Sequence, residues 1–238
     1  MSHMTTSTST TLQPTTSLPR KPYGGLQMEG PVASWYARIT RDRVDHRTDA
    51  QAIAAQLPSG SAVLEVAPGP GFTAIELARL GDYAITGLDI SRSFVRIATD
   101  NAQRAGVDID FRHGDVTAMP FPDASFDVAF CKAAFKNFAD PVAALNEIHR
   151  VLRSGGRASI FDMRKDAPRE AIEREIQSMH VSRPNAFVMR LVFRFGLLRA
   201  AYTREALLSV VSRSRFGQGE LITDGIGFEL RLVKGEPQ

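Results

Sequence analysis

The feature that most constrains the fold is a strand, turn and helix pattern that begins at residue 62 and then repeats along the chain. Residues 62–66 form a short apolar run, residues 67–71 a turn rich in Gly and Pro, and residues 73–80 a helical segment closed by Gly81. A short apolar strand followed directly by a helix is typical of parallel sheets whose strands are joined by helices. The sequence therefore predicts an α/β fold.

The same alternation continues and predicts a complete sheet. The further strands that we expect cover residues 83–89, 107–112, 126–131, 157–163, 220–223 and 226–233. Helical patterns at residues 35–57, at 91–105 and after Asp140-Pro141 complete the layers. The last two strands lie too close together for a crossover, so they should form an antiparallel hairpin. We predict a doubly wound, mostly parallel seven-stranded sheet with an antiparallel last strand and helices on both faces.

The 238 residues, of which 43% are hydrophobic, are enough for one sizeable core, so residues 26–238 are expected to form a single domain. Residues 1–25 are mostly Thr, Ser, Pro and Gly, which favours a disordered tail, and residues 1–4 resemble a cloning remnant. Residues from about 165 to 205 exceed what a crossover needs. We interpret them as a helical cap inserted over the active site.

Composition also excludes several function classes. The single cysteine, Cys131, excludes an internal disulfide framework and any multi-cysteine metal site, and we expect no metal. The chain has no apolar run of the ~20 residues that a membrane span needs, and its first residues lack a secretory signal, so we expect a cytoplasmic protein. The net charge of +3 is too small to indicate a nucleic-acid partner by itself.

The turn after the first strand decides the class of ligand, because open α/β sheets bind ligands outside the carboxyl ends of their strands. Here the turn reads Glu65-Val66-Ala67-Pro68-Gly69-Pro70-Gly71, and its glycines let a ligand approach the backbone. A nicotinamide-dinucleotide enzyme would need the spacing Gly-x-Gly-x-x-Gly, which is absent. The turn instead resembles motif I of the class I S-adenosylmethionine-dependent methyltransferases, in which an acidic residue precedes Gly-x-Gly-x-Gly. Ala67 stands where the first of those glycines usually lies.

The resemblance extends over about a hundred residues. Gly87-Leu88-Asp89-Ile90-Ser91 is similar to the second motif, whose acid accepts hydrogen bonds from both ribose hydroxyls, and Gly114-Asp115-Val116 to the third, whose acid accepts from the adenine amino group. Residues 125–128 and 147–156 match later motifs, and the resemblance implies S-adenosylmethionine as cofactor. The cofactor-binding residues that it implies are Trp35, Tyr36, Glu65, Ala67, Gly69, Gly71, Asp89, Ile90, Asp115, Val116, Cys131 and Lys132. Of these, the aromatic rings Trp35 and Tyr36 could face the sulfonium or pack against the sheet.

The methyl acceptor is less constrained than the cofactor. Many small-molecule relatives carry a histidine in the loop after strand four, and residues 131–138 contain none, so no catalytic residue is assigned. A solvent-facing lysine is the favoured interpretation of Lys136, because a base role would need burial to lower its pKa. Asp162 and Arg164 lie near strand five, and solvated charges are likewise the simpler interpretation of both. The tentative substrate-facing residues are Lys136, Asp162, Arg164 and His180.

Three functions stay open at this point. A small-molecule methyltransferase acting on an apolar acceptor is favoured, because a helical cap encloses small ligands. Seven arginines against one acid in residues 183–215 suggest a nucleic-acid or protein methyltransferase instead, although residues 131–134 lack Asn-Pro-Pro-Tyr and no proline precedes Cys131. A non-catalytic module that binds the cofactor or a membrane surface is the third. The sequence leaves the acceptor, the methylated atom, the base, the oligomeric state and the role of the basic cap undetermined.

Overall fold

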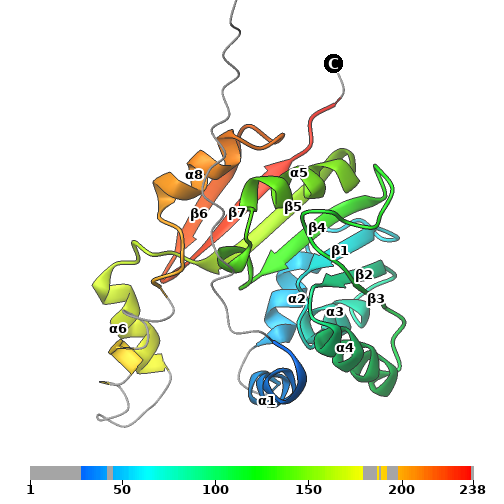
Figure 1. The fold of residues 1–238 in the computed structure, drawn as a ribbon, viewed down its shortest axis with the longest axis horizontal. Coiled ribbons are helices and arrows are strands. Elements are labelled where there is room, and N and C mark those ends of the chain that lie inside the picture. Colours follow the sequence, from blue (N-terminus) through cyan, green and yellow to red (C-terminus); the bar gives the residue numbers. More distant parts are fainter. Residues whose placement is uncertain (1–27, 42–44, 179–186, 188, 192–197, 237–238) are drawn as a thin grey trace, which may run out of the picture.

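The structure is a computed structural model, which describes residues 28–41, 45–178, 187, 189–191 and 198–236. Its centre is one seven-stranded sheet with the order β3-β2-β1-β4-β5-β7-β6 (Figure 1). The strands are β1 (Ala62–Val66), β2 (Ala84–Asp89), β3 (Asp110–His113), β4 (Phe126–Lys132), β5 (Leu152–Met163), β6 (Glu220–Asp224) and β7 (Gly227–Val233). Neighbours pair in parallel except that β7 is antiparallel to both β5 and β6. The predicted class, strand number and antiparallel last strand are confirmed.

The helices follow the strands in the predicted alternation. They are α1 (Gly30–Thr40), α2 (His46–Ala54), α3 (Phe72–Ala78), α4 (Arg92–Ala105), α5 (Pro141–Val151), α6 (Arg169–Ser178) and α8 (Arg204–Ser212), with a 3-10 turn η1 (Phe135–Asn137). The single helix expected at residues 35–57 is two helices. Asp45 marks the start of the second, because its carboxylate accepts a hydrogen bond from the Thr48 amide and so caps a new helix.

Two apolar clusters form the core, one on each face of the sheet. Helices α2, α3 and α4 pack on one face around Val63, Ile85 and Phe130, while α5 and α8 pack on the other around Leu64 and Leu145. Side chains alternate along each strand, so β1 sends Val63 to one cluster and Leu64 to the other. The sheet is thus covered from both sides near β1 and β4, which makes its central strands a rigid base for the site.

The region expected to form a cap is described only in part. Helix α6 lies beyond the end of β5, where Ile176 and Leu198 pack with Met163 in a small separate cluster (Figure 1). Residues 179–186, 188 and 192–197, and with them His180, lie outside the described residues, as do residues 1–27. The single domain at 26–238, the tail and the extent of the cap therefore stay predictions. Within the described ranges, no helix is both long and apolar enough to cross a membrane.

Candidate cofactor site

The turn between β1 and α3 is held in a left-handed backbone conformation at three positions. Ala67, Gly69 and Gly71 have φ angles of 57°, 55° and 78°. A Cβ on Gly71 would lie 2.7 Å from the Phe111 ring and 2.9 Å from Cβ of Ala98, so packing requires glycine there. At Gly69 a Cβ would meet nothing within 4 Å, so the backbone borders open space that a ligand could occupy.

Asp89, at the end of β2, fastens this turn to the sheet. Its side chain is buried, with the residue 6% exposed, and its carboxylate accepts hydrogen bonds from the amides of Gly69 (3.0 Å) and Ser91 (2.8 Å). Burial raises the pKa of Asp89 to about 6, against the opposing effect of those two amides. A carboxylate offers about four acceptor positions, so two remain for hydroxyl donors from a ligand.

Glu65, at the end of β1, is a buried carboxylate with one oxygen unpaired. The residue is 3% exposed, its Oε2 atom has no hydrogen-bond partner among the described residues, and the Ala74 amide in the first turn of α3 donates to the carboxylate. Burial, with a smaller contribution from the charge of Asp89, raises the pKa of Glu65 to about 8. A buried carboxylate of this kind is best satisfied by a cationic or hydrogen-bond-donating ligand.

The end of β3 lies beside Asp89, because Asp89 pairs with His113 in the parallel register and the Gly114 amide donates to the Asp89 carbonyl oxygen at 3.0 Å. Asp115 follows as an exposed residue whose carboxylate accepts from the amide and hydroxyl of Thr117 at 2.8 and 2.9 Å. The structure therefore brings the predicted residues from β1, β2 and β3 to one edge of the sheet. Ile90, 55% exposed, and half-buried Val116 belong to the same edge.

The segment before α1 is tied to the start of α4, directly after Asp89. The Glu29 carboxylate accepts hydrogen bonds from the amides of Arg92 (2.9 Å) and Ser93 (3.1 Å), and the Gly30 amide donates to the Ser93 hydroxyl at 2.9 Å. Sequence reasoning missed this contact, because nothing local relates residues that are more than sixty positions apart. It places α1 beside the site.

The two aromatic residues of α1 behave differently. Tyr36 packs edge to face on Phe94 of α4, with 5.8 Å between ring centroids. Trp35 is 49% exposed, so packing against the sheet does not explain its position in the described structure. A role for either ring next to a sulfonium stays a prediction.

Two of the predicted cofactor-binding residues, Cys131 and Lys132, lie at the end of β4 and point in opposite directions. The Cys131 thiol is fully buried in the cluster under α5, where burial raises its pKa, so the thiol does not reach the surface of the site. Lys132 points to the opposite face and forms an ion pair with Asp49 of α2. Burial lowers the pKa of Lys132.

Lys136 and Asp162 form a buried ion pair between the loop after β4 and the end of β5. Lys136 Nζ lies 2.7 Å from Asp162 Oδ1 and also donates to the Ala133 carbonyl oxygen at 2.8 Å, while the Lys136 amide donates to Asp162 Oδ2 at 2.9 Å. The side chains are 13% and 1% exposed. The expectation that these two residues are solvated charges is therefore wrong, because strand five places the carboxylate directly under the loop.

Arg164, the last described substrate-facing candidate, makes its contacts with other residues than that pair. Its amide donates to the Ile226 carbonyl oxygen at 2.9 Å, and its side chain is 18% exposed with Nε buried and without a partner among the described residues. Asp166 is its weak ion-pair partner at 4.0 Å. The expectation of a fully solvated arginine is thus also wrong.

Comparison with known proteins identifies the central segment. Residues 64–160 match a family described as a methyltransferase domain, the segment that contains the turn, Asp89, Asp115 and β4. This segment, called the methyltransferase domain below, is similar to class I S-adenosylmethionine-dependent methyltransferases. The family and the fold imply S-adenosylmethionine as its cofactor.

Relatives of this methyltransferase domain act on varied molecules. The ubiquinone/menaquinone biosynthesis C-methyltransferase of Bdellovibrio bacteriovorus is 38% identical over 105 residues, which cover 44% of this chain and 45% of that protein. The 27-O-demethylrifamycin SV methyltransferase of Amycolatopsis mediterranei is 36% identical over 117 residues, with 48% and 43% covered. The chain thus spans about half the length of these two curated relatives.

Solved structures show that the fold extends beyond the matched segment. A Methanococcus maripaludis protein superposes with a TM-score of 0.69 at 22% identity, covering 92% of this chain and 99% of its own. An S-adenosylmethionine-dependent methyltransferase from Aquifex aeolicus superposes with a TM-score of 0.66 at 16% identity, covering 85% and 98%. At these identities the likeness establishes the fold alone.

The residues of the methyltransferase domain fit the cofactor that its family implies. Gly69 leaves open space beside its backbone, Asp89 keeps acceptor positions for a ribose diol, and the unpaired oxygen of Glu65 suits a cation. S-adenosylmethionine carries two such positive groups, an ammonium and a sulfonium. No cluster of three or more potential metal ligands occurs among the residues that the structure describes.

Proposed function

We propose that the protein transfers the methyl group of S-adenosylmethionine to an apolar small molecule, with a reduced quinone-type ring as the first acceptor to test. The observation that carries the proposal is the turn at residues 67–71, joined by Asp89 to the neighbouring strand and bordered by the unpaired Glu65. The names of several relatives, which include demethylmenaquinone and 2-phytyl-1,4-naphthoquinone methyltransferases, support the acceptor class.

In this proposal each strand end holds one part of the cofactor. Asp89 accepts hydrogen bonds from the ribose hydroxyls, Asp115 accepts from the adenine amino group, and Glu65 complements the positive charge of the methionine portion. When bound, S-adenosylmethionine supplies a methyl group on a positively charged sulfur, which suits an in-line transfer that depends mostly on positioning. The rigid strand ends provide that positioning.

Lys136 is the residue that we assign to the acceptor. Two of its three N–H donors are used by the Ala133 carbonyl oxygen and Asp162, which leaves one for an oxygen of the acceptor. An ammonium held in this way favours the deprotonated form of a ring hydroxyl, and so increases electron density on the carbon or oxygen to be methylated. Asp162 is then a positioning residue, since it acts through Lys136.

Among its described residues, the arginine-rich segment gives no observation that favours a second function. Arg190 is engaged by Glu173 in a bidentate ion pair with contacts of 2.7 to 3.0 Å, and Arg213 donates to the Ser209 carbonyl oxygen. Arg183 and Arg194 lie outside the described residues. The nucleic-acid, protein and membrane-surface alternatives therefore gain no observation in their favour.

The first experiment separates cofactor binding from turnover. Titration calorimetry with S-adenosylhomocysteine should show binding that is lost in Asp89→Ala and kept in Asp110→Ala, an exposed carboxylate on the edge strand β3. Incubation with S-adenosylmethionine and reduced naphthoquinones should then yield a methylated product by mass spectrometry. Absence of binding by the folded protein would refute the proposed function, whereas binding without turnover on apolar rings would refute only the acceptor class.

A further inference from the structure

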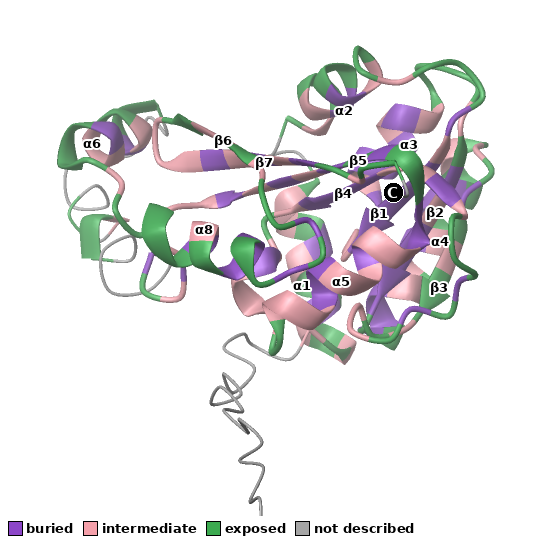
Figure 2. Ribbon diagram, turned by 90° about the horizontal axis from the view of Figure 1, so that it is seen from above, coloured by how far each residue is buried: buried purple, intermediate pink, exposed green. Residues whose placement is uncertain are grey.

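In the part of the chain that the structure describes, no helix covers the face of the sheet opposite α5 and α8 over β5, β7 and β6. Pairing places Val128 beside Arg157, Phe130 beside Ser159, and Ser159 beside Arg231, so these side chains share one face. Helix α2 packs over β1 and β4, and Figure 2 shows no described helix on this side of β7 between α2 and α6. The uncovered part lies along the middle of the strands, away from the strand ends that form the cofactor site.

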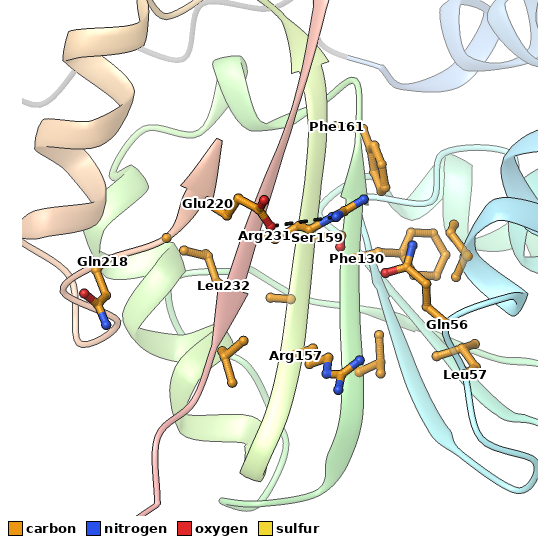
Figure 3. A pocket seen from close by; sticks show the side chains of 15 residues that line it. Gln56, Leu57, Phe130, Arg157, Ser159, Phe161, Gln218, Glu220, Arg231 and Leu232 are labelled. Carbon is orange, nitrogen blue, oxygen red and sulfur yellow. Dashed lines mark ion pairs between the residues drawn. The ribbon is translucent and has the colours of Figure 1, made fainter. Parts of the chain in front are cut away.

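A cavity of about 520 Å³ occupies this open face. Its apolar lining comes from α2 and the segment after it, from β4 and β5, and from β7, with Leu57, Phe130 and Phe161 among its larger members. In Figure 3, Phe161 lies at one end and Arg157 at the other, Gln56 and Leu57 line one side, and Glu220 lies on the opposite side. Its volume falls within the range of roughly 300–1,000 Å³ that is typical of small-molecule sites.

Of the two arginines at the cavity, one is paired with acids and the other is not. Arg231 is paired with Glu229 at 2.8 Å and with Glu220 at 3.7 Å, and the Ser159 hydroxyl donates to Glu229 at 3.3 Å. Arg157, an exposed residue, makes no side-chain hydrogen bond or ion pair with any described residue. A guanidinium that borders a partly apolar cavity without an acid of its own complements an anionic group.

We propose that this cavity binds an amphiphile with an anionic head group, at a site separate from the one for methyl transfer. The apolar chain would lie against Phe130, Leu57 and Phe161, and the carboxylate or phosphate of the head group would pair with Arg157. Phe161 and Asp162 are consecutive on β5 and so point to opposite faces of the sheet, which separates this cavity from the Lys136–Asp162 pair that we assign to the acceptor. The proposal goes beyond the proposed function and does not depend on it.

Calorimetry on the full chain tests the head group. Dodecanoate and dodecyl phosphate should each bind at one site per chain, and Arg157→Ala should weaken both by about two- to fivefold, as expected for an ion pair lost at an exposed arginine. Dodecanol should bind the two proteins equally. Arg96→Ala, a change at an exposed arginine on α4, is the matched control and should leave binding unchanged. The tighter of the two anions identifies the head group, and equal binding by the native chain and Arg157→Ala would overturn the proposal.

A second variant tests the location. Ser159→Trp places a large ring in the cavity and should abolish dodecanoate binding while circular dichroism shows the native fold. S-adenosylhomocysteine should bind Ser159→Trp as it binds the native chain and should not compete with dodecanoate. Competition between the two would show that the amphiphile enters the cofactor site, and light scattering that detects a dimer lost in Ser159→Trp, without amphiphile binding, would show that a second copy covers this face. Either result would refute the proposal.

Discussion

Replacing Glu65 with glutamine isolates the effect of one buried charge on the stability of the cofactor-free protein. In the folded chain the pKa of Glu65 is raised to about 8, mainly by burial, whereas an unfolded chain has the ordinary value near 4.5. The folded state therefore keeps a proton that the unfolded state has released between these pH values. Stability contributed by this group is complete below pH 4.5 and is lost as pH rises toward 8. The amide side chain of the Glu65→Gln variant does not titrate, so the variant does not lose this stability as pH rises.

The magnitude follows from the width of that window. Each pH unit in which the two states differ by one proton changes the free energy of unfolding by about 1.36 kcal/mol. Between pH 5 and pH 8 the variant should therefore gain about 3 to 4 kcal/mol relative to the native chain. The introduced amide can still accept from the Ala74 amide, and its unpaired NH₂ adds a penalty of about 1–3 kcal/mol that does not depend on pH. The predicted quantity is therefore the change with pH of the difference in unfolding free energy between the variant and the native chain, and not the size of that difference at any one pH.

Urea unfolding followed by circular dichroism at pH 5, 6, 7 and 8, without cofactor, measures this difference. Asp110→Asn, at an exposed carboxylate on β3, is the control and should show a constant difference from the native chain. If Glu65→Gln also gave a constant difference across the range, the folded pKa of Glu65 would not be raised. The argument that this carboxylate is poised for a cationic ligand would then fail.

Three other measurements test the site. Ala67→Gly should raise the melting temperature slightly, because a left-handed conformation costs alanine about 1–2 kcal/mol and the glycine's extra unfolded-state entropy offsets about 0.4–1 kcal/mol of that; a lower melting temperature would contradict the strain. Since the pKa of Asp89 is raised to about 6, affinity for S-adenosylhomocysteine in calorimetry should fall about tenfold between pH 7 and pH 5, and an unchanged affinity would exclude Asp89 as the ribose acceptor. Lys136→Met should lower kcat about 100-fold and leave cofactor affinity unchanged, and Asp162→Asn should shift the pH profile of kcat. If the two variants lost stability but showed neither kinetic effect, the ion pair would have only a structural role.

The fold was predictable because its signals are local. Short, mostly apolar runs such as residues 62–66 and 126–131, bounded by turn residues, favour buried strands, and helix boundaries were marked by Ser91, Gly106 and Asp140, whose capping geometry the structure confirms. The antiparallel last strand followed from the short spacing between the last two strands. The break near Asp45 was missed, because a capping acid inside a helical pattern looks like an ordinary surface residue.

The site was predictable only where one motif is contiguous in sequence. The turn at residues 67–71 and Asp89 could be chosen from their neighbours alone. The burial of Lys136 by Asp162 and the contact of Glu29 with the start of α4 depend on residues 26 and more than 60 positions apart. Solvation of Lys136 was therefore predicted from composition, whereas the sheet register decides it.

The features of the cofactor site share one energetic property. The left-handed Ala67, the buried Asp89 and the unpaired oxygen of Glu65 each lower the stability of the ligand-free chain. A ligand that brings two hydroxyl donors and a positive charge would satisfy both carboxylates at once, without rearranging the strand ends that hold them. Binding should then lower the pKa of both acids, release protons near neutral pH and raise the melting temperature with ligand concentration. Calorimetry in two buffers of different ionisation enthalpy measures that proton release, and its absence would mean that the ligand does not contact these carboxylates.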